Sequence, residues 1–180
     1  MSPASKHDLV ALTGFMGSGK SSVGYALALR LGWRFCDLDR EIERGQRRTI
    51  REIFSTEGEL RFRDIETACL RSILGTVVRP FVLATGGGTY VQAQNAQLLR
   101  DAGAIVVLLD ASVETLMARC CPEGKPGDAR PLAQDRDAFA RLYEQRLSAY
   151  RAADLCVTSD KQSPDWVARE IARRLGLEAG

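Results

Sequence analysis

The segment from Gly14 to Ser21 (GFMGSGKS) matches the phosphate-binding pattern G-x-x-x-x-G-K-[ST] at every fixed position. In such a loop, backbone N–H groups surround a polyphosphate, because glycines leave space that side chains would block. Lys20 is expected to reach the β- and γ-phosphate oxygens, and the Ser21 hydroxyl is expected to hold Mg²⁺. The alternative is a chance match in an ordinary loop.

The residues around this loop fit the phosphate-binding interpretation. Leu9 to Thr13 (LVALT) is predicted to be a buried strand, and Lys20 to Leu31 is predicted to be a helix with Val23 and Leu27 on its inner face. A helix that starts at the loop directs its unpaired N–H groups and the positive end of its dipole at the phosphates.

Two carboxylates follow the next predicted strand, Arg34 to Asp37. Open α/β sheets bind ligands at the carboxyl ends of their strands, which is where Asp37 and Asp39 lie. If the strand continued, both side chains would face one cleft, where one acid orders the metal's water and the other accepts a hydroxyl proton. A solvated strand end, or a helix cap in the case of Asp39, is the alternative.

A third predicted strand, Pro80 to Ala84, runs directly into Thr85-Gly86-Gly87-Gly88. Three consecutive glycines cost backbone entropy, so they suit a chain that turns tightly or passes close to a ligand. An ordinary strand-to-helix turn is the alternative.

Three arginines offer planar donor groups to a carboxylate or phosphate: Arg63, Arg130 and Arg146. Spacing alone favours a solvated surface position for each of them. The sole histidine, His7, lies in the polar segment 1–8, which argues against a histidine-based catalytic dyad.

Strands and helices alternate along the chain, which predicts one α/β domain over residues 1–180 with its core at about 9–175. The expected architecture has three layers, α/β/α, around a parallel sheet of about five strands. Helix is predicted for 51–74 with a break near Gly58, and for 95–102, 137–153 and the segment after Ser163. Segment 120–131 contains helix-breaking Pro and Gly residues, and it is predicted to be a mobile lid.

The composition gives no support for a nucleic-acid-binding, membrane-spanning or disulfide-rich protein. The 25 Lys+Arg residues nearly balance the 23 Asp+Glu residues, which gives no electrostatic reason to expect nucleic acid or an anionic membrane as a partner. No apolar run approaches the roughly 20 residues of a membrane span. The five cysteines are odd in number and include the adjacent pair Cys120 and Cys121, which favours a reduced, cytoplasmic protein.

Taken together, these residues resemble the shikimate kinase family from about residue 9 to 175. Besides the phosphate-binding loop, the similarity includes motifs in a fixed order: Asp37-Leu38-Asp39, Gly58-Glu59, Phe62-Arg63, Glu66, Ala84-Thr85-Gly86-Gly87-Gly88, Arg130-Pro131-Leu132 and Arg146 four residues before Tyr150. The resemblance implies a monomer with a nucleoside-monophosphate-kinase-like fold that phosphorylates the 3-hydroxyl of shikimate with ATP and Mg²⁺, in aromatic amino-acid biosynthesis.

The resemblance also implies roles for single residues. Asp37 would reach the metal through water, and Asp39 would bind the acceptor hydroxyls and either act as the base or orient the attacking hydroxyl. Arg63 and Arg146 would bind the shikimate carboxylate, while Arg130 would move onto the ATP phosphates with the lid. The nucleotide would be contacted by Gly17, Ser18, Gly19, Lys20, Ser21, Ser22 and Arg119, and segment 158–164 would line the adenine. The ring hydroxyls of shikimate would be contacted by Gly86, Gly87 and Gly88.

The chain departs from the family pattern at Ser148, which replaces a proline between Arg146 and Tyr150, and in a lid that is longer than usual. Two other functions remain open at this point. One is another small-molecule kinase of this architecture, such as a gluconate kinase, because fold alone does not fix the substrate. The other is a catalytically silent protein that binds nucleotide or shikimate.

Overall fold

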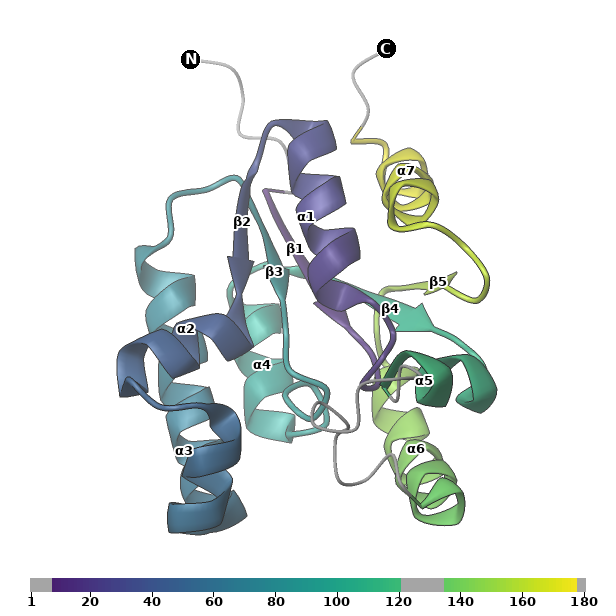
Figure 1. Cartoon of the computed structure of the whole chain (residues 1–180). Helices are drawn as coiled ribbons and strands as arrows, with labels where there is room; N and C mark the ends of the chain where they lie inside the picture. Colours follow the sequence, from purple (N-terminus) through teal and green to yellow (C-terminus); the bar gives the residue numbers. More distant parts are fainter. Residues whose placement is uncertain (1–7, 121–134, 178–180) are drawn as a thin grey trace.

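Five short segments of mostly buried apolar residues form a parallel sheet in the computed structural model, which describes residues 8–120 and 135–177 (Figure 1). The strands are hydrogen-bonded in the order β2-β3-β1-β4-β5. Their bounds are β1 (Leu9–Thr13), β2 (Arg34–Asp37), β3 (Phe81–Ala84), β4 (Ile105–Asp110) and β5 (Leu155–Thr158). The predicted five-stranded parallel sheet is confirmed.

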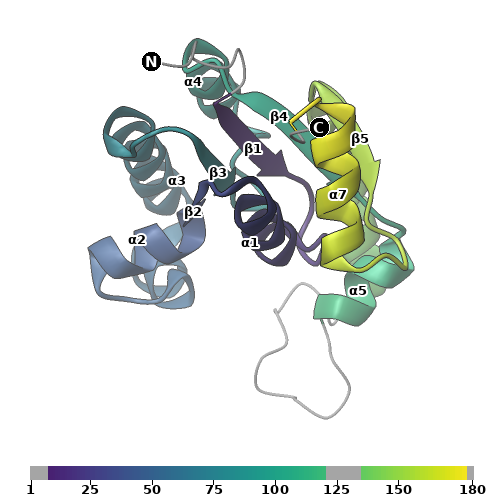
Figure 2. The same cartoon turned by 90° about the horizontal axis from the view of Figure 1, so that it is seen from above.

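Helices cover both faces of this sheet, because its strands are apolar on both sides. Val10 and Leu12 of β1 pack with α1 and α7, whereas Leu9 and Ala11 pack with α2, α3 and α4 (Figure 2). The helices are α1 (Lys20–Leu31), α2 (Leu38–Gln46), α3 (Ile50–Thr76), α4 (Ala93–Asp101), α5 (Val113–Cys120), α6 (Arg136–Tyr150) and α7 (Pro164–Arg174). The predicted three-layer architecture is confirmed.

The register of the strands brings three loops to one edge of the sheet. Leu12 of β1 and Asp37 of β2 both pair with Ala84 of β3. Because these strands are parallel and end at the same level, the segments that follow them leave the sheet side by side. The phosphate-binding loop, the start of α2 and the glycine turn therefore lie together.

Helix α3 is interrupted where the sequence predicts a break. Gly58 has φ 79° and ψ 176°, a conformation outside the helical region. The helix starts with a capping box, in which Thr49 accepts a hydrogen bond from the Glu52 N–H and the Glu52 carboxylate accepts one from the Thr49 N–H. Arg63 lies after the break, on the part of α3 that packs beside the glycine turn.

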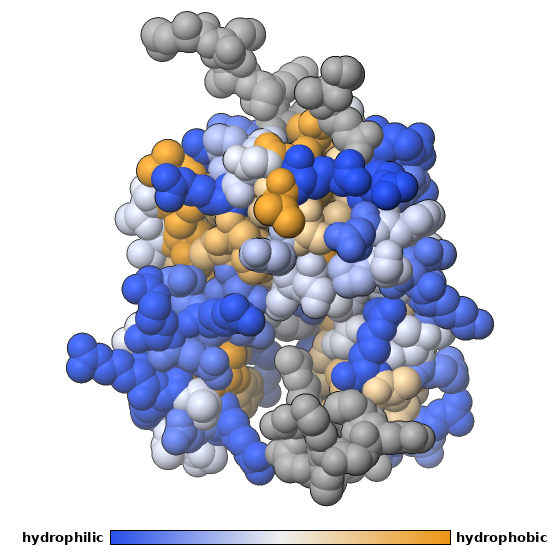
Figure 3. Space-filling view, turned by 45° about the horizontal axis from the view of Figure 1, so that its top comes forward, coloured by the Kyte–Doolittle hydropathy of each residue, from blue (hydrophilic) through white to orange (hydrophobic). Residues whose placement is uncertain are grey.

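The predicted lid, residues 120–131, lies outside the described residues except for Cys120, the last residue of α5. Arg130 and Cys121 are therefore not placed. Within residues 8–120 and 135–177, no helix combines the length and apolar composition that a bilayer-spanning segment needs. Much of the face seen in Figure 3 is hydrophilic, and its apolar residues gather mainly in the upper half of the view.

Candidate active site

The phosphate-binding loop connects β1 to α1 in a conformation that requires glycine. Gly14 has φ +140°, and a Cβ there would lie 2.5 Å from the backbone oxygen of Leu109. Lys20, the first residue of α1, donates hydrogen bonds from Nζ to the backbone oxygens of Gly14 (2.8 Å) and Phe15 (2.9 Å). The lysine ammonium is thus held over the loop, at the helix N-terminus where phosphate oxygens bind.

Ser21 and Asp37 meet as the metal prediction requires. Ser21 Oγ donates a hydrogen bond of 2.6 Å to Asp37 Oδ2, and Asp37 is buried. The same carboxylate caps α2 by accepting a hydrogen bond from the Arg40 N–H. A hydroxyl oxygen beside a carboxylate oxygen is a donor pair suited to the hard cation Mg²⁺.

Strand β2 has the predicted bounds and does not continue to Asp39, so strand alternation is not what places Asp37 and Asp39. The strand ends at Asp37, and Asp39 lies in the first turn of α2. The helix N-cap is Asp37, not Asp39 as the structural alternative supposed, because the Asp37 side chain satisfies an otherwise unpaired N–H. The turn directs Asp39 at the glycines: a Cβ on Gly86 would lie 2.8 Å from Asp39 Oδ1.

Two cavities meet at Asp39. The phosphate cavity has a volume of about 370 Å³, and the acceptor cavity has a volume of about 420 Å³. Met16, Asp39 and Gly87 line both. Ten other predicted site residues line one cavity or the other. The phosphate cavity is lined by Gly17, Gly19, Lys20, Ser21, Ser22 and Arg119, and the acceptor cavity by Arg63, Gly86, Gly88 and Arg146.

Ser18, a predicted nucleotide contact, lines neither cavity. It is fully buried within the loop, and its Oγ lies 3.4 Å from Lys20 Nζ. Arg119 connects the two segments predicted to hold the nucleotide, since it donates hydrogen bonds to the backbone oxygens of Gly17 (3.3 Å) and Ser159 (2.7 Å).

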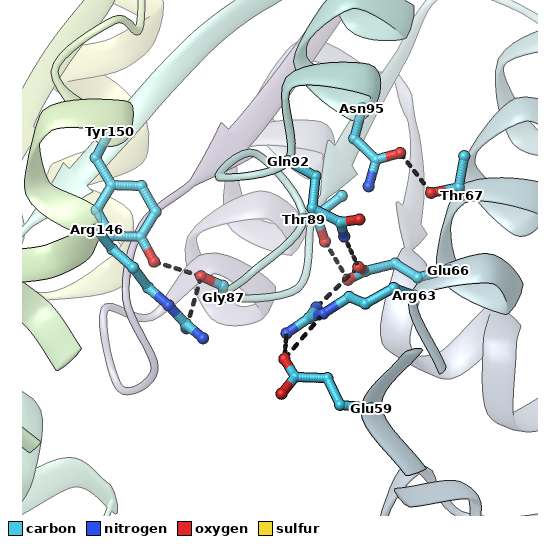
Figure 4. Close-up of polar contacts among 10 residues, drawn as sticks. All are labelled: Glu59, Arg63, Glu66, Thr67, Gly87, Thr89, Gln92, Asn95, Arg146 and Tyr150. Carbon is cyan, nitrogen blue, oxygen red and sulfur yellow. Dashed lines mark hydrogen bonds and ion pairs between the residues drawn. The ribbon is translucent and has the colours of Figure 1, made fainter. Parts of the chain in front are cut away.

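Arg63 is positioned by two carboxylates on its own helix. It donates hydrogen bonds to Glu66 Oε2 (2.9 Å) and to Glu59 Oε1 (3.1 Å), as Figure 4 shows. Burial alone would lower the pKa of Arg63, but the charge and hydrogen bonds of Glu66 and Glu59 outweigh it and raise the pKa. Arg63 therefore stays a cation that can bind an anionic group in the acceptor cavity.

Glu66 holds Arg63 and the residues after the glycine turn in place. The sequence comparison with the family includes this residue but assigns it no role. Its side chain is 1% exposed and accepts hydrogen bonds from Thr89 Oγ1 (2.6 Å), Gln92 Nε2 (2.7 Å) and Arg63. The available signal was its position three residues after Arg63, a spacing that places two side chains on one face of a helix. Its partners beyond the glycine turn could not be read from that spacing.

Replacing Glu66 with alanine is expected to lower the free energy of unfolding by about 3–5 kcal/mol, the usual cost of removing one partner of a buried ion pair. Arg63 would lose its buried counter-ion, and Thr89 and Gln92 would lose their acceptor. Urea unfolding measures the change. Glu59→Ala is the matched control, because Glu59 pairs with the same arginine but is 64% exposed. Its cost should stay below about 1 kcal/mol, and equal losses in both variants would contradict this role of Glu66.

Arg146 reaches the acceptor cavity from α6. Its guanidinium lies 5.6 Å from the centroid of the Phe15 ring, and it donates a hydrogen bond of 3.3 Å to the Gly87 backbone oxygen. The helix continues without interruption through Ser148 to Tyr150. The loss of the family proline therefore leaves Arg146 on a regular helix, directed at the site.

The glycine turn passes close to groups of the acceptor cavity. A Cβ on Gly88 would lie 2.6 Å from an Arg63 guanidinium nitrogen, and one on Gly86 would lie 3.0 Å from Glu66 Oε1. None of the three glycines has positive φ. Close approach, rather than an unusual backbone conformation, is the reason for glycine at Gly86 and Gly88.

Comparisons with known proteins agree with this geometry. The family model described as shikimate kinase matches residues 16–176. The chain is 45% identical over 166 residues to a shikimate kinase of Geobacter sulfurreducens, which covers 91% of this chain and 88% of the relative. It is 38% identical over 167 residues to one of Persephonella marina, with coverages of 92% and 98%.

Among solved structures, a shikimate kinase from Acinetobacter baumannii in complex with shikimate superposes with a TM-score of 0.85 at 35% identity, covering 97% of this chain and 96% of that one. A gluconokinase from Sinorhizobium meliloti has a TM-score of 0.57 at 18% identity, over 97% and 98% of the chains, and this likeness shows the fold alone. The family model and the close relatives span most of the chain, so this protein belongs to the shikimate kinase family.

Proposed function

We propose that the chain transfers the γ-phosphoryl group of ATP to the 3-hydroxyl of shikimate and releases ADP and shikimate 3-phosphate. The observation that carries this proposal is the meeting of the phosphate and acceptor cavities at Asp39. Phosphoryl transfer needs the attacking oxygen, the phosphorus and the leaving oxygen roughly in line. A carboxylate at the junction of donor and acceptor sites is suited to hold that attacking hydroxyl.

On the donor side, Lys20 neutralises charge on the transferred phosphoryl group, and the loop N–H groups hold the β- and γ-phosphates. Ser21 and Asp37 would hold Mg²⁺, Ser21 directly and Asp37 through water. When bound, this ion neutralises phosphate charge and orients the phosphate oxygens. Arg119 would support the nucleotide from its contacts with Gly17 and Ser159.

On the acceptor side, Asp39 orients the 3-hydroxyl and accepts its proton as the oxygen–phosphorus bond forms. The bond between the γ-phosphorus and the β–γ bridging oxygen breaks, and the electron pair leaves with ADP. Arg63 and Arg146 bind the shikimate carboxylate, because both present guanidinium groups to the acceptor cavity. The N–H groups of Gly86 to Gly88 contact the ring hydroxyls.

The role of Arg130 on the ATP phosphates and closure of segment 120–131 stay predictions. We further propose a single-domain, cytoplasmic monomer. Cys36, Cys69 and Cys156 are free thiols, in keeping with a reducing compartment.

An acceptor panel tests the proposed substrate. ADP release is measured in the presence of Mg²⁺ and ATP with shikimate, gluconate or a nucleoside monophosphate. Of the three acceptors, only shikimate is expected to be turned over, because it combines ring hydroxyls for Asp39 with a carboxylate for Arg63 and Arg146. Turnover with gluconate but not with shikimate would assign the chain to another kinase activity. ADP release that does not depend on shikimate would contradict the proposed function, and no ADP release with any acceptor would favour a silent binding protein.

Replacing Arg63 with alanine is expected to raise the Kd for shikimate by about tenfold to a hundredfold, because a charge-assisted hydrogen bond contributes about 1.5–3 kcal/mol. Isothermal titration of the folded variant with shikimate measures the change. Arg61→Ala is the matched control: Arg61 lies on the same helix, is 59% exposed, pairs with Glu57 and lines neither cavity. An unchanged Kd in Arg63→Ala would show that Arg63 is not a carboxylate ligand.

A further inference from the structure

Gly86 to Thr89 form a hydrogen-bonded turn whose central peptide is flanked by two glycines, so either of two orientations would be sterically allowed. The Thr89 N–H donates a hydrogen bond of 3.2 Å to the Gly86 oxygen, so the central peptide joins Gly87 to Gly88. Gly88 does not have positive φ, which excludes a type II turn and fits type I. Rotation of the central peptide would convert type I to type II, and that conversion needs a residue that accepts positive φ at the third position. Glycine does so at little cost.

A tyrosine and an arginine of α6 hold the central peptide in the observed orientation. The Tyr150 hydroxyl and Arg146 both donate hydrogen bonds to the Gly87 backbone oxygen (Figure 4). Tyr150 is 1% exposed, and burial raises its pKa to about 12 against the opposing effect of Arg146. Its hydroxyl therefore remains a protonated donor throughout the pH range of an enzyme assay.

The orientation of the Gly87 oxygen fixes the N–H group on the other side of the same peptide. In a trans peptide, the C=O and N–H groups point in opposite directions. With the oxygen turned toward α6, the Gly88 N–H points away from α6, and Gly88 lines the acceptor cavity. No backbone oxygen among the described residues accepts a hydrogen bond from this N–H. A rotated peptide would present an acceptor where the observed one presents a donor.

We propose that Tyr150 is a positioning residue for shikimate: its hydroxyl selects the type I form of the Gly86–Thr89 turn and so keeps the Gly88 N–H available to a ring hydroxyl. This inference rests on the proposed function. Tyr150 touches no substrate in this account and acts through the glycine turn. Its effect is expected to fall on the affinity for shikimate, because Gly88, whose N–H it keeps available, lines the acceptor cavity and not the phosphate cavity.

The test compares Tyr150→Phe with Tyr90→Phe. Tyr90 is 4% exposed and donates a hydrogen bond of 3.0 Å from its hydroxyl to the Ala152 oxygen. The control therefore also removes a buried tyrosine hydroxyl that connects the segment after the glycine turn to the residues after α6, but it leaves the Gly87 oxygen untouched. Tyr150→Phe should raise the KM for shikimate by about three- to tenfold, the factor that one neutral hydrogen bond represents, with kcat and the KM for ATP within about twofold. Tyr90→Phe should change the KM for shikimate by less than about twofold.

Shikimate methyl ester distinguishes an effect of Tyr150 through the glycine turn from an effect through Arg146, because this acceptor lacks the carboxylate charge that Arg146 would bind. If Tyr150 acts through the Gly88 N–H, the fold-loss caused by Tyr150→Phe persists with the ester. A loss that disappears with the ester would mean that Tyr150 only places Arg146, and it would overturn the proposal. An unchanged KM in Tyr150→Phe, or an equal rise in Tyr90→Phe, would also overturn it. Wild-type protein that fails to turn over shikimate would instead contradict the proposed function.

Discussion

Replacing Asp39 with asparagine is expected to lower kcat by about 100- to 10,000-fold, while the Kd for ATP stays within about twofold. Three described residues line both cavities, Met16, Asp39 and Gly87, and of these Asp39 has the ionisable side chain. Asparagine has nearly the same shape and keeps one acceptor oxygen, but it cannot take the proton of the attacking hydroxyl. Single-turnover measurement of ADP formation gives the rate, and isothermal titration gives the Kd for ATP.

The matched control for this substitution is Asp64→Asn. Asp64 is an exposed acid on α3, directly after Arg63 in the sequence, and it lines neither cavity. Its substitution makes the same chemical change near the site and should leave kcat within about twofold, as is usual for surface positions. If Asp39→Asn retained kcat within about threefold, Asp39 would be neither the base nor the residue that orients the acceptor.

Replacing Lys20 with methionine is expected to lower kcat by about 100- to 1,000-fold, the range found when one preorganised donor to a developing charge is removed. Methionine fills a similar space without the ammonium. Lys20 is the lysine among the described residues of the phosphate cavity, where its charge lies against the loop oxygens of Gly14 and Phe15. Rapid-quench measurement of product formation at saturating ATP gives the rate.

The Kd for shikimate is the internal control for this variant. Lys20 does not line the acceptor cavity, so Lys20→Met should bind shikimate as the wild type does. A loss of shikimate binding equal to the loss of rate would indicate that the loop had collapsed, and a rate within about threefold of wild type would mean that Lys20 does not stabilise the transferred phosphoryl group.

Local sequence signals predict most of the fold, because they depend on neighbouring residues. The buried strand over Leu9 to Thr13, the helix after Ser163 and the break at Gly58 each have a local physical cause, and the structure confirms them. Helix and strand ends differ by a few residues, as in α6, which is predicted over 137–153 and observed as Arg136–Tyr150.

The position of Asp39 in a helix, rather than in a continued strand, also has a local cause. Asp37 is the last residue of a strand, and aspartate is also a good helix N-cap. Alternation along the strand does not show whether the strand continues past Asp37 or a helix begins there. Once the Asp37 side chain accepts a hydrogen bond from the Arg40 N–H, the helix begins at once and Asp39 turns toward Gly86.

Interactions between segments that lie far apart in the chain could not be predicted from the sequence. Glu66 meets Thr89 and Gln92 only because α3 packs beside the glycine turn, and Tyr150 meets Gly87 across 63 positions of the chain. No spacing rule connects such residues. The sequence therefore predicts which groups contact the substrates, whereas the residues that hold those groups in place become visible in the packed structure.

The central claim is that one site, with Asp39 at the junction of its two cavities, joins the γ-phosphoryl group to the 3-hydroxyl of shikimate. Phosphorus NMR of a reaction with ATP, Mg²⁺ and shikimate follows both products at once. We expect ADP and shikimate 3-phosphate to appear in equal amounts, with no inorganic phosphate and no phosphorylation at another ring hydroxyl. ADP accompanied by inorganic phosphate, or phosphate on a different hydroxyl, would contradict the account.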